Sequence, residues 1–415
     1  MTAPWTPMQW PAAWNDPSAL DLLKGSAINY LLVDDGAGLE PVRTQARQLG
    51  LQIGVPGGVG VGDRGVGVTA IKGEWPGVKM ASSGSGGVTA GPTGNPWVDS
   101  NGWQIRLASA LHPETAVWVN AAPPEKVRVS AGSYLVAIAD CGAYGGRWVI
   151  SLDAELASGL LTKSADAQAT WKTITAAAGF FAERKEWAGY NPIAVVGVVS
   201  DFTGPNEFFT QELLNLLARA GQHYRIVRKE MARAPVLDGL RAVIYADVQE
   251  PSPALRKQIL SFVEAGGTLI ASPQWGAAPG APAKPDDEGP LFSVRSLGKG
   301  RVALARTAPD DPYQWANDSV VLVSHRYDVV RFWNGGATGS FPAMAPDGKH
   351  AVAHLFFYAN RGPDAASVRV AGRFRAAKAR TVEGPLALIG TENQKGAIEV
   401  HLPQAPQYVA LELDA

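Results

Sequence analysis

The stretch YADVQEPSPALRKQILSFVEAGGTLIAS, Tyr245–Ser272, carries the clearest local pattern in the chain. One apolar run ends at Tyr245. Ser252 followed by Pro253 is typical of a helix start, because the serine side chain accepts a hydrogen bond from a free amide and proline needs no amide partner there. The predicted helix has one apolar stripe and ends at two glycines, and a second apolar run follows. Strand, helix and strand in this order indicate two parallel strands of one sheet. The apolar stripe consists of Leu255, Ile259, Phe262 and Val263. The two glycines are Gly266 and Gly267, and the second apolar run is Thr268–Ala271.

The residues before this stretch repeat the pattern. IAVVGVVSDF, Ile193–Phe202, is a continuous apolar run of the kind that forms buried parallel strands. An amphipathic helix with Phe209 and Leu213 on its apolar face follows and ends at Gly221. Two further strands, His223–Val227 and Ala242–Tyr245, complete the series, and residues 276–290 are expected to form a flexible loop or a linker. We therefore predict a doubly wound, flavodoxin-like α/β domain over residues 191–335.

Residues 1–190 alternate short apolar runs with amphipathic stretches, which is typical of βα units. Five or six strands can be identified, whereas a complete (β/α)8 barrel has eight. We therefore predict an incomplete or irregular barrel-like domain. The expected strands are Ile28–Val33, Leu51–Val55, Gly77–Ala81, Ala116–Asn120 and Arg147–Leu152, and the expected helices are Leu39–Leu49, Gly102–Leu111, Ser133–Tyr144 and Ala167–Trp187.

Residues 336–415 alternate apolar and polar side chains with a period of two. The runs AVAHLFFYAN, ASVRVAG, IEVHLP and YVALEL show this pattern and are separated by proline and glycine turns. We predict a small antiparallel β-sandwich domain. Just before it, Asp311–Trp333 has the spacing of a helix.

Composition excludes several classes of protein. A chain of 415 residues exceeds the size of a single core, and 46% apolar residues supply material for several. The formal net charge of -1 and the lack of basic clusters argue against a nucleic-acid partner. No segment has the roughly 18 uninterrupted apolar residues of a membrane span, so we expect a soluble protein, cytoplasmic or exported after removal of a leader. Cys141 is the one cysteine, which excludes an intrachain disulfide.

The stretch Tyr245–Ser272, together with GKGRVAL at Gly298–Leu304, resembles the glutamine-amidotransferase-like trimerisation domain of bacterial family 42 β-galactosidases. The last β stretch, ending VHLPQAPQYVALEL, is similar in position to the small C-terminal sandwich of that family. The resemblance implies a barrel, an amidotransferase-like domain and a β sandwich in this order. It also implies a carbohydrate ligand and a possible homo-oligomer formed through the middle domain, where Phe208 and Phe209 supply surplus apolar surface.

The sequence departs from the family pattern at two places. An amidotransferase needs a cysteine nucleophile in a tight turn after a strand, but the turn after Tyr245 reads Ala246, Asp247, Val248, so we expect no glutaminase activity. The related barrels carry an Asn-Glu pair whose glutamate is the acid/base. In AVWVNAAP the corresponding Asn120 is followed by Ala121, so by this alignment the acid is missing.

Four acidic residues are candidates for catalysis. Glycoside hydrolysis uses two carboxyl groups, about 5 to 5.5 Å apart for retention or about 6.5 to 9.5 Å apart for inversion, and a barrel places them at the C-terminal ends of its strands. For each candidate the alternative is a helix cap or a side chain that binds loop amides. The candidates are Asp34 and Asp35 after the strand Ile28–Val33, Glu74 in KGEWPG, and Asp153 after RWVISL; Asp201 and Glu207 are instead expected at the seam between domains.

The segment AGPTGNPWVDSNGWQIRLA, Ala90–Ala108, is the densest polar and aromatic loop. Indole faces can lie under a sugar ring while amide and carboxylate groups bind its hydroxyls. In the alternative, Asp99 or Ser100 caps the next helix and both tryptophans pack inward. The expected substrate-binding residues are Trp75, Trp97, Asp99, Asn101, Trp103 and Asn120.

No cofactor or metal is predicted. Gly60, Gly62 and Gly65 have G-x-G-x-x-G spacing, but the residues after them have β character and do not begin the helix that would bind a pyrophosphate. The six histidines show no metal-ligand spacing. Two functions remain: a glycoside-hydrolase-like protein that acts on or binds a carbohydrate, and a catalytically inactive relative that serves as a sugar-binding or oligomeric scaffold.

Overall fold

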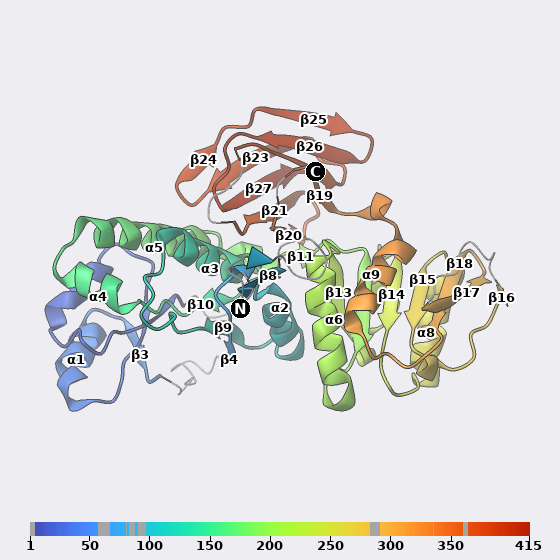
Figure 1. Ribbon diagram of the computed structural model, residues 1–415, viewed down its shortest axis with the longest axis horizontal. Helices are drawn as coiled ribbons and strands as arrows, with labels where there is room; N and C mark the ends of the chain where they lie inside the picture. The colour runs from blue at the N-terminus through green and yellow to red at the C-terminus, as the bar shows by residue number, and fades with distance from the viewer. Residues whose placement is uncertain are drawn as a thin grey trace.

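A computed structural model describes residues 5–56, 67–79, 81–82, 88–89, 97–282, 291–334, 336–359 and 364–415. The protein is a mixed α/β protein with three regions; in Figure 1 the first two lie side by side and the third, in red, lies above them. We call residues 5–190 the N-terminal region, residues 193–329 the middle region, and residues 330–415 the C-terminal region. Gly60, Gly62 and Gly65 lie outside the described residues, and the expected loop 276–290 is described only as far as Pro282.

Within its described residues, the N-terminal region contains six short parallel strands. Two three-stranded sheets, in the orders β1-β2-β3 and β10-β9-β4, are joined by a parallel bridge between Met8 and Ile150. The combined order is therefore β3-β2-β1-β10-β9-β4, and no pairing among the described residues joins β3 to β4. The strands are β1 (Pro7–Gln9), β2 (Tyr30–Leu32), β3 (Gln52–Gly54), β4 (Val68–Lys72), β9 (Ala116–Asn120) and β10 (Arg147–Trp148).

Helices cover these strands, and two small hairpins lie beside them. The strand expected at Gly77–Ala81 is not part of the parallel set, because Gly77–Lys79 pairs antiparallel with Trp97–Asp99, and Val68–Lys72 takes the place in the sheet. The helices are α1 (Glu40–Gln48), α2 (Gly102–Leu111), α3 (Ala131–Ala143), α4 (Ala154–Leu161) and α5 (Ala165–Glu183), and the hairpins pair β5 (Gly77–Lys79) with β8 (Trp97–Asp99) and β6 (Ala81–Ser82) with β7 (Val88–Thr89).

The middle region is a seven-stranded sheet in the order β13-β12-β14-β15-β18-β17-β16. Its first five strands are parallel and the last two pair antiparallel. Helices α6 and α9 share a core with one face, and α8 shares a core with the other. The bounds are β12 (Val196–Ser200), α6 (Glu207–Arg219), β13 (Tyr224–Arg228), α7 (Ala234–Leu237), β14 (Ala242–Tyr245), α8 (Pro253–Glu264), β15 (Thr268–Ala271), β16 (Ala281–Pro282), β17 (Phe292–Leu297), β18 (Gly300–Ala305) and α9 (Pro312–Val323).

The strand–helix–strand unit predicted from Tyr245–Ser272 is confirmed. Strands β14 and β15 are parallel, with Val243 opposite Leu269. The Ser252 side chain accepts a hydrogen bond from the amide of Leu255, and Pro253 is the first residue of α8. The local signals at both ends of the helix therefore located it correctly.

The helix expected over Asp311–Trp333 is too long by nearly half of its length, because α9 spans Pro312–Val323. Asp311 caps α9, but the helix ends at Val323 because Ser324 adopts a left-handed conformation with φ of 76°. A short 3-10 turn follows, and then β19 (Val330–Phe332) pairs with a strand of the C-terminal region. The apolar spacing continued past Val323 because β19 is itself apolar.

The C-terminal region consists of two antiparallel sheets packed face to face, as the period of two predicted. Alternate residues of β21 face different neighbours: Ala353 and Leu355 enter the core between the sheets, whereas Val352 and Phe356 pack against the N-terminal region. One sheet is β11 (Asn191–Pro192), β20 (Thr338–Met344), β21 (His350–Phe357), β27 (Tyr408–Asp414), β23 (Ala376–Thr381) and β24 (Gly384–Leu386), and the other is β19, β22 (Ala366–Ala371), β26 (Ala397–Leu402) and β25 (Gly390–Gln394).

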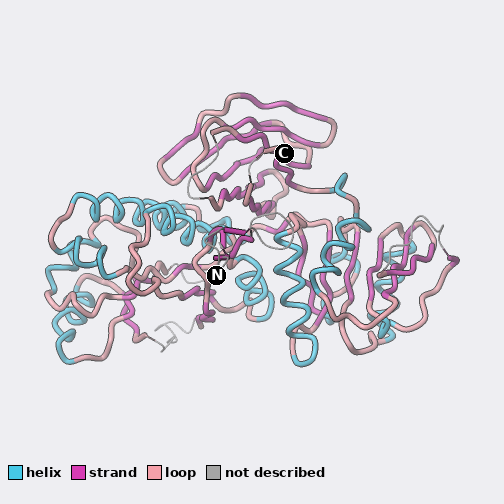
Figure 2. The backbone as a smooth tube through the Cα atoms, in the orientation of Figure 1, coloured by secondary structure: helices cyan, strands magenta, loops and turns pink. Residues whose placement is uncertain are grey.

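The three regions meet near the centre of the molecule. Strand β11, on the chain between the N-terminal and middle regions, pairs with β20 of the C-terminal region. Helix α2 packs against α6 and β13, and Leu107 of α2 belongs to the core of the middle region. Figure 2 shows this meeting of helices and strands below the C-terminal sandwich. The meeting point is therefore built from segments far apart in the sequence.

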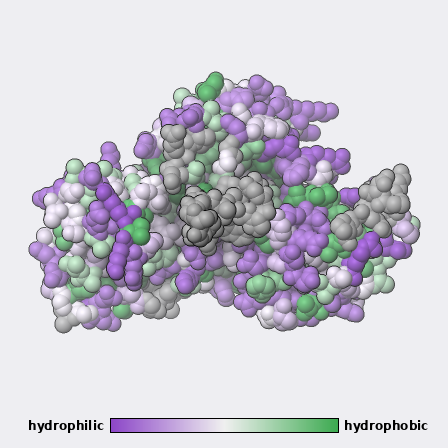
Figure 3. All heavy atoms as spheres, in the orientation of Figure 1, coloured by the Kyte–Doolittle hydropathy of each residue, from purple (hydrophilic) through white to green (hydrophobic). Residues whose placement is uncertain are grey.

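The surface seen in Figure 3 is mainly polar, with apolar residues in small separate groups. Of the two phenylalanines expected to support self-association, Phe208 is 74% exposed, whereas Phe209 packs edge-on against Trp315 with ring centroids 5.6 Å apart. Self-association through the middle region therefore stays a prediction, and of these two residues only Phe208 is exposed enough to contact a second copy of the chain.

Candidate functional site: a cavity between three regions

A cavity of about 230 Å³ lies where the three regions meet; we call it the junction cavity. Helix α2 with Ser100 shortly before it forms one wall, the turn before β13 and the start of β13 form a second, and strand β20 with Tyr358, which directly follows β21, forms a third. The lining residues used below are Ser100, Trp103, Arg106, Arg219, Gln222, His223, Tyr224, Ser340, Phe341 and Tyr358.

The turn between α6 and β13 brings three polar residues to the cavity. Helix α6 ends at Arg219, and two residues later Gly221 has a φ of 71°, which is accessible to glycine without strain. The amide of Gln222 bonds back to the carbonyl of Leu217, which closes the helix end. Gln222, His223 and Tyr224 then follow in succession along the cavity wall.

Each of these three residues is buried and keeps one polar atom without a hydrogen-bond partner among the described residues. The side chains are those of Gln222, His223 and Tyr224, which are 4%, 7% and 1% exposed, and the atoms are Oε1, Nδ1 and the phenolic oxygen. A buried polar atom left without a partner costs about 1 to 3 kcal/mol. Three consecutive residues on one cavity wall therefore carry an unsatisfied polar atom, and each of these atoms is itself closed off from solvent in this conformation.

The other polar ends of the same side chains are fixed. Gln222 Nε2 donates to Asp328 Oδ1 at 3.2 Å, and His223 Nε2 lies 3.0 Å from Ser340 Oγ. These bonds hold the amide and the imidazole in one orientation, so the free oxygen and nitrogen have fixed positions. Burial, with a smaller contribution from the charge of Arg106, lowers the pKa of His223 to about 4. The imidazole is therefore neutral near pH 7.

Two arginines border the cavity. Arg106 of α2 lies over the Tyr224 ring, with its guanidinium carbon 4.1 Å from the ring centroid and 5.4 Å from that of Phe341, and it donates to the Tyr224 carbonyl. Arg219 of α6 forms an ion pair with Asp99 at 3.3 Å. Arg106 has no acidic partner among the described residues.

A buried network supports the third wall. The Tyr358 hydroxyl donates to Asp140 Oδ1 at 2.9 Å, and the amide of Asn101 donates to Asp140 Oδ2 at 2.8 Å. Burial raises the pKa of Asp140 to about 6, although these bonds oppose the shift. Asp140 in α3 thereby joins the N-terminal region to the C-terminal region behind the cavity.

The predicted polar and aromatic loop contributes to the cavity in part. Trp103 lines the cavity and also packs against the core of the middle region. Asp99 lies at its edge through the ion pair with Arg219. Asn101 is fully buried and exchanges two hydrogen bonds with the backbone of Glu74, so it fixes the loop around Glu74. The side chain of Trp97 lies outside the described residues.

The four predicted acids follow the C-terminal ends of parallel strands, but none lines the junction cavity as described. Asp153 is buried and caps α4 by accepting from the amide of Leu156, while its second oxygen accepts from the Tyr134 hydroxyl at 3.2 Å. Glu74 is exposed. Asp35 is exposed and pairs with Arg43, which also binds the carbonyl of Asp34.

The two remaining predicted residues lie near the same strand ends. Trp75 is half-buried, packs edge-on against Tyr134 and Trp148, and donates from Nε1 to the carbonyl of Ala122 at 2.9 Å. Asn120 is exposed at the end of β9. The structure therefore separates the predicted substrate-binding residues into two groups, with Asp99 and Trp103 at the cavity and Trp75 and Asn120 at the strand ends.

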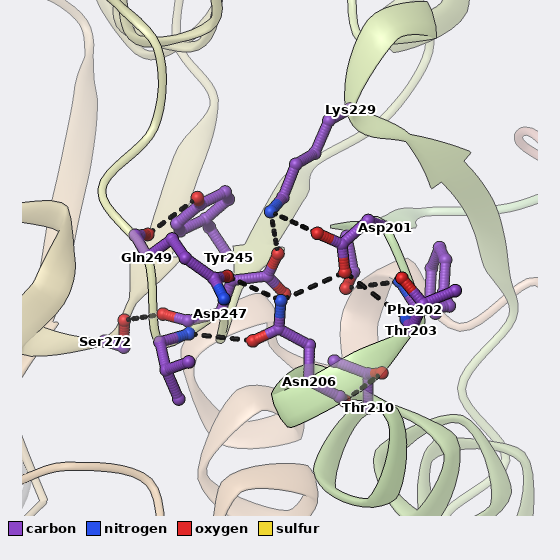
Figure 4. A network of polar contacts seen from close by, with 12 residues as sticks. Asp201, Phe202, Thr203, Asn206, Thr210, Lys229, Tyr245, Asp247, Gln249 and Ser272 are labelled. Atoms are coloured by element: carbon purple, nitrogen blue, oxygen red, sulfur yellow. Dashed lines mark hydrogen bonds and ion pairs between the residues drawn. The ribbon is translucent and has the colours of Figure 1, made fainter.

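A second polar cluster lies at the C-terminal ends of the middle strands (Figure 4). Lys229 Nζ contacts Asp201 Oδ2 at 2.9 Å and Asp247 Oδ2 at 2.5 Å. The Asn206 amide donates to Asp201 at 3.0 Å and to Gln249 at 2.7 Å. Asp201 was expected at the seam between domains; this is corrected, because its partners all belong to the middle region.

Burial shapes the charges of this second cluster. Asp247 has a fully buried side chain, and burial raises its pKa although the Lys229 ammonium lies beside it. Partial burial acts in the same direction on Asp201, but hydrogen bonds from Asn206 and Lys229 lower its pKa below the usual value. Lys229 thus forms ion pairs with two carboxylates at the point where the strand order reverses. Doubly wound sheets commonly bind ligands at this point. In this protein that point is filled by its own side chains.

Within the described residues, no group of three or more histidine, cysteine, aspartate or glutamate side chains is placed to hold a metal ion. In the same part of the chain, no helix combines the length and apolar character needed to cross a membrane. Cys141 is buried in α3.

Sequence reasoning missed Arg106, Gln222 and Tyr224. Arg106 lies within the amphipathic helix GWQIRLASAL, and Gln222 and Tyr224 flank the start of a strand, so each has an ordinary local explanation. The polar run QHYR directly after Gly221 was the one available signal, because it places polar side chains where a buried strand begins.

No protein-family model matches the chain, and no curated protein matches it. Solved structures similar to it include α-L-fucosidase isoenzyme 2 from Paenibacillus thiaminolyticus, at 10% identity and a TM-score of 0.48 over 75% of this chain and 62% of that one. A GH42 β-galactosidase from G. stearothermophilus is similar at 10% identity and a TM-score of 0.47, over 91% of this chain and 66% of that one. A rhamnosidase from Novosphingobium sp. PP1Y is similar at 11% identity and a TM-score of 0.47, over 94% of this chain and 37% of that one. The chain thus spans less than two thirds of the length of these proteins. Glycoside hydrolases, the class that the sequence resembles, are therefore among the similar structures.

Proposed function

We propose that this protein binds a carbohydrate in the junction cavity. We interpret the N-terminal region as an incomplete (β/α) barrel, the middle region as an amidotransferase-like domain and the C-terminal region as a β sandwich, which is the glycoside-hydrolase type of architecture. The observation that carries the proposal is the row of unpartnered atoms on Gln222, His223 and Tyr224 beside aromatic rings.

The chemistry of this row matches a sugar. Sugar hydroxyls both donate and accept hydrogen bonds, and an amide oxygen, a neutral imidazole nitrogen and a phenolic hydroxyl together offer both roles. Trp103 and Phe341 add apolar ring surface, which suits the C–H groups of a sugar ring. The volume of about 230 Å³ is below the roughly 300 Å³ at which pockets for drug-sized ligands begin, so one sugar ring is the appropriate size.

The proposal is for binding. Cleavage of a glycosidic bond requires two carboxyl groups on either side of the bond. The described lining of the cavity contains neither aspartate nor glutamate. Asp34, Asp35, Glu74 and Asp153 remain candidates for catalysis at a separate place, the C-terminal ends of the parallel strands, and Cys141 is buried away from the turn where a glutaminase would need its nucleophile.

A matched pair of alanines provides the test. Ala220 and Ala265 each follow the last residue of a helix and precede a glycine, but Ala220 lines the cavity whereas Ala265 is exposed. We expect calorimetric titration with a panel of neutral and acidic monosaccharides to give dissociation constants between about 1 μM and 1 mM. Ala220→Leu should fill the cavity and weaken binding about tenfold or more, and Ala265→Leu should leave it unchanged. Absence of binding to the whole panel, or equal binding by the two variants, would contradict the proposal.

A further inference from the structure

We propose that the ligand of the junction cavity is an acidic sugar, a single ring that carries one negative group bound by Arg106. The inference rests on the proposed carbohydrate function and names the class of ligand within it. The negative group is a carboxylate, sulfate or phosphate, since all three present oxygen atoms to a guanidinium in the same way.

Among the described charged side chains around the cavity, Arg106 is the cation without an ion pair, and Asp140 behind the wall accepts hydrogen bonds from Tyr358 and Asn101 instead. Arg219 is neutralised by Asp99, with the charged atoms 3.3 Å apart. Asp328, which holds Gln222, is paired in turn with Arg331 at 3.3 Å. Arg106 is half-buried and has no ion-pair partner among the described residues. A guanidinium in this setting lacks the compensation that charged groups inside proteins normally have.

Arg106 is also held in place before any ligand arrives. Its guanidinium lies over the ring of Tyr224 and near that of Phe341, and one of its amino groups donates to the Tyr224 carbonyl. The stacked rings and this bond restrict the side chain, so little conformational entropy is lost when the remaining N–H groups bind an anion. Those remaining donors suit two oxygen atoms of one acidic group.

The neighbouring groups suit the neutral part of the same ligand. His223 is neutral near pH 7 and Gln222 and Tyr224 carry no charge, so these residues can bind hydroxyls while Arg106 binds the acid. Tyr224 joins the two functions, because its ring supports Arg106 and its hydroxyl is one of the unpartnered groups. One ring with hydroxyls and one acidic substituent therefore matches the chemistry of these four residues.

The test compares ligands that differ only in charge. Glucuronate and galacturonate are titrated beside glucose and galactose, and then glucose 6-phosphate and inorganic sulfate, by calorimetry at low and high salt. We expect at least one acidic sugar to bind about 10- to 100-fold more tightly than its neutral counterpart, with affinity falling as salt rises. Inorganic sulfate alone should compete weakly, because it lacks the ring.

Variants of Arg106 assign the effect to this residue. Arg106→Gln should weaken the acidic sugar about 10- to 100-fold while changing the neutral sugar little, and Arg106→Lys should recover part of the loss. Arg47→Gln is the control, since Arg47 is exposed on α1. Thermal unfolding of each variant establishes that it is folded, and the salt dependence of the unmodified protein tests the charge without any variant.

The outcomes separate the two proposals. If no sugar binds, the proposed function itself is overturned. If neutral and acidic sugars bind alike, or Arg106→Gln weakens both equally, the function stands and the acidic ligand is overturned. If inorganic sulfate competes as well as the acidic sugars, the cavity is a simple anion site and the inference is wrong.

Discussion

Strand β13 has a polar cluster at each end, and the two clusters use their polar groups in opposite ways. At its end, Lys229 lies between Asp201 and Asp247, so the charges compensate one another within the protein. At its start, His223 and Tyr224 border a cavity with polar atoms that no described residue satisfies. The first cluster stabilises the fold, whereas the second is suited to a ligand. The difference lies in charge compensation, because Asp247 also has carboxylate oxygens without a hydrogen bond but is paired with the Lys229 ammonium.

The largest effect is expected from breaking the compensated cluster. Lys229→Met leaves the fully buried Asp247 without its counter-charge, and loss of one partner of a buried ion pair typically costs about 3 to 5 kcal/mol. Urea unfolding should show this loss, whereas Lys257→Met on the exposed face of α8 should change stability by less than about 0.5 kcal/mol. The double variant Lys229→Met, Asp247→Asn should recover part of the loss, and no recovery would contradict the pairing.

The next effect concerns Asp140, behind the cavity wall. Burial raises its pKa from 3.8 to about 6 in the folded protein, so the folded state binds this proton more tightly than the unfolded state. Its contribution to stability is therefore complete below pH 3.8 and is lost as the pH rises through about 6, a change of about 3 kcal/mol.

Asp140→Asn removes this titration. We expect the unfolding free energy of the unmodified protein to fall relative to that of Asp140→Asn by about 3 kcal/mol between about pH 3.5 and pH 7.5. Asp21→Asn, which changes an exposed carboxylate paired with Lys24, serves as the control. Parallel profiles for the protein and Asp140→Asn would show that Asp140 is not shifted as described.

A smaller effect is expected at Asp153, a candidate acid that the structure places at a helix cap. Asp153→Ala removes the acceptor of the Leu156 amide and a partner of Tyr134, so a loss of about 2 kcal/mol is expected with sugar binding unchanged. Ser164→Ala is a matched control, because Ser164 stands at the same position before α5 without a side-chain bond. A loss of sugar binding in Asp153→Ala at full stability would instead place Asp153 in the site.

The sequence predicted those features that depend on neighbours in the chain. The helix start at Ser252 and its end at Gly266 are set by local hydrogen bonds, and the alternation in β21 follows from two sheets that each need one apolar face. Strand β1 was missed because three residues that begin with a proline carry too little pattern. The end of α9 was missed because Ser324 shows no sequence signal for its left-handed conformation.

The candidate site depended on contacts that local patterns do not contain. Trp103 was selected for its aromatic, polar surroundings and does line the cavity, but Arg106, one turn later, reads as an ordinary polar residue of an amphipathic helix. Its role appears only when Tyr224 and Phe341, from two other regions, enclose it. The aromatic and polar residues near residue 100 could therefore indicate a candidate sugar site in the sequence. The other residues of that candidate site come together only when the three regions pack against one another.

The smallest expected change in the free energy of unfolding comes from a pair of variants that tests most directly whether a buried hydroxyl is satisfied. Tyr224→Phe and Tyr134→Phe remove the same hydroxyl from two buried tyrosines, but the Tyr134 hydroxyl is bonded to Asp153 whereas that of Tyr224 has no described partner. Tyr134→Phe should therefore destabilise the protein by about 1 to 1.5 kcal/mol, and Tyr224→Phe should leave stability unchanged or raise it by up to about 1 kcal/mol. Sugar affinity should change in the opposite sense, with a loss of about fivefold or more in Tyr224→Phe and none in Tyr134→Phe. Equal destabilisation by the two variants would mean that the Tyr224 hydroxyl is already satisfied, and only Gln222 and His223 would then carry unsatisfied atoms on this wall.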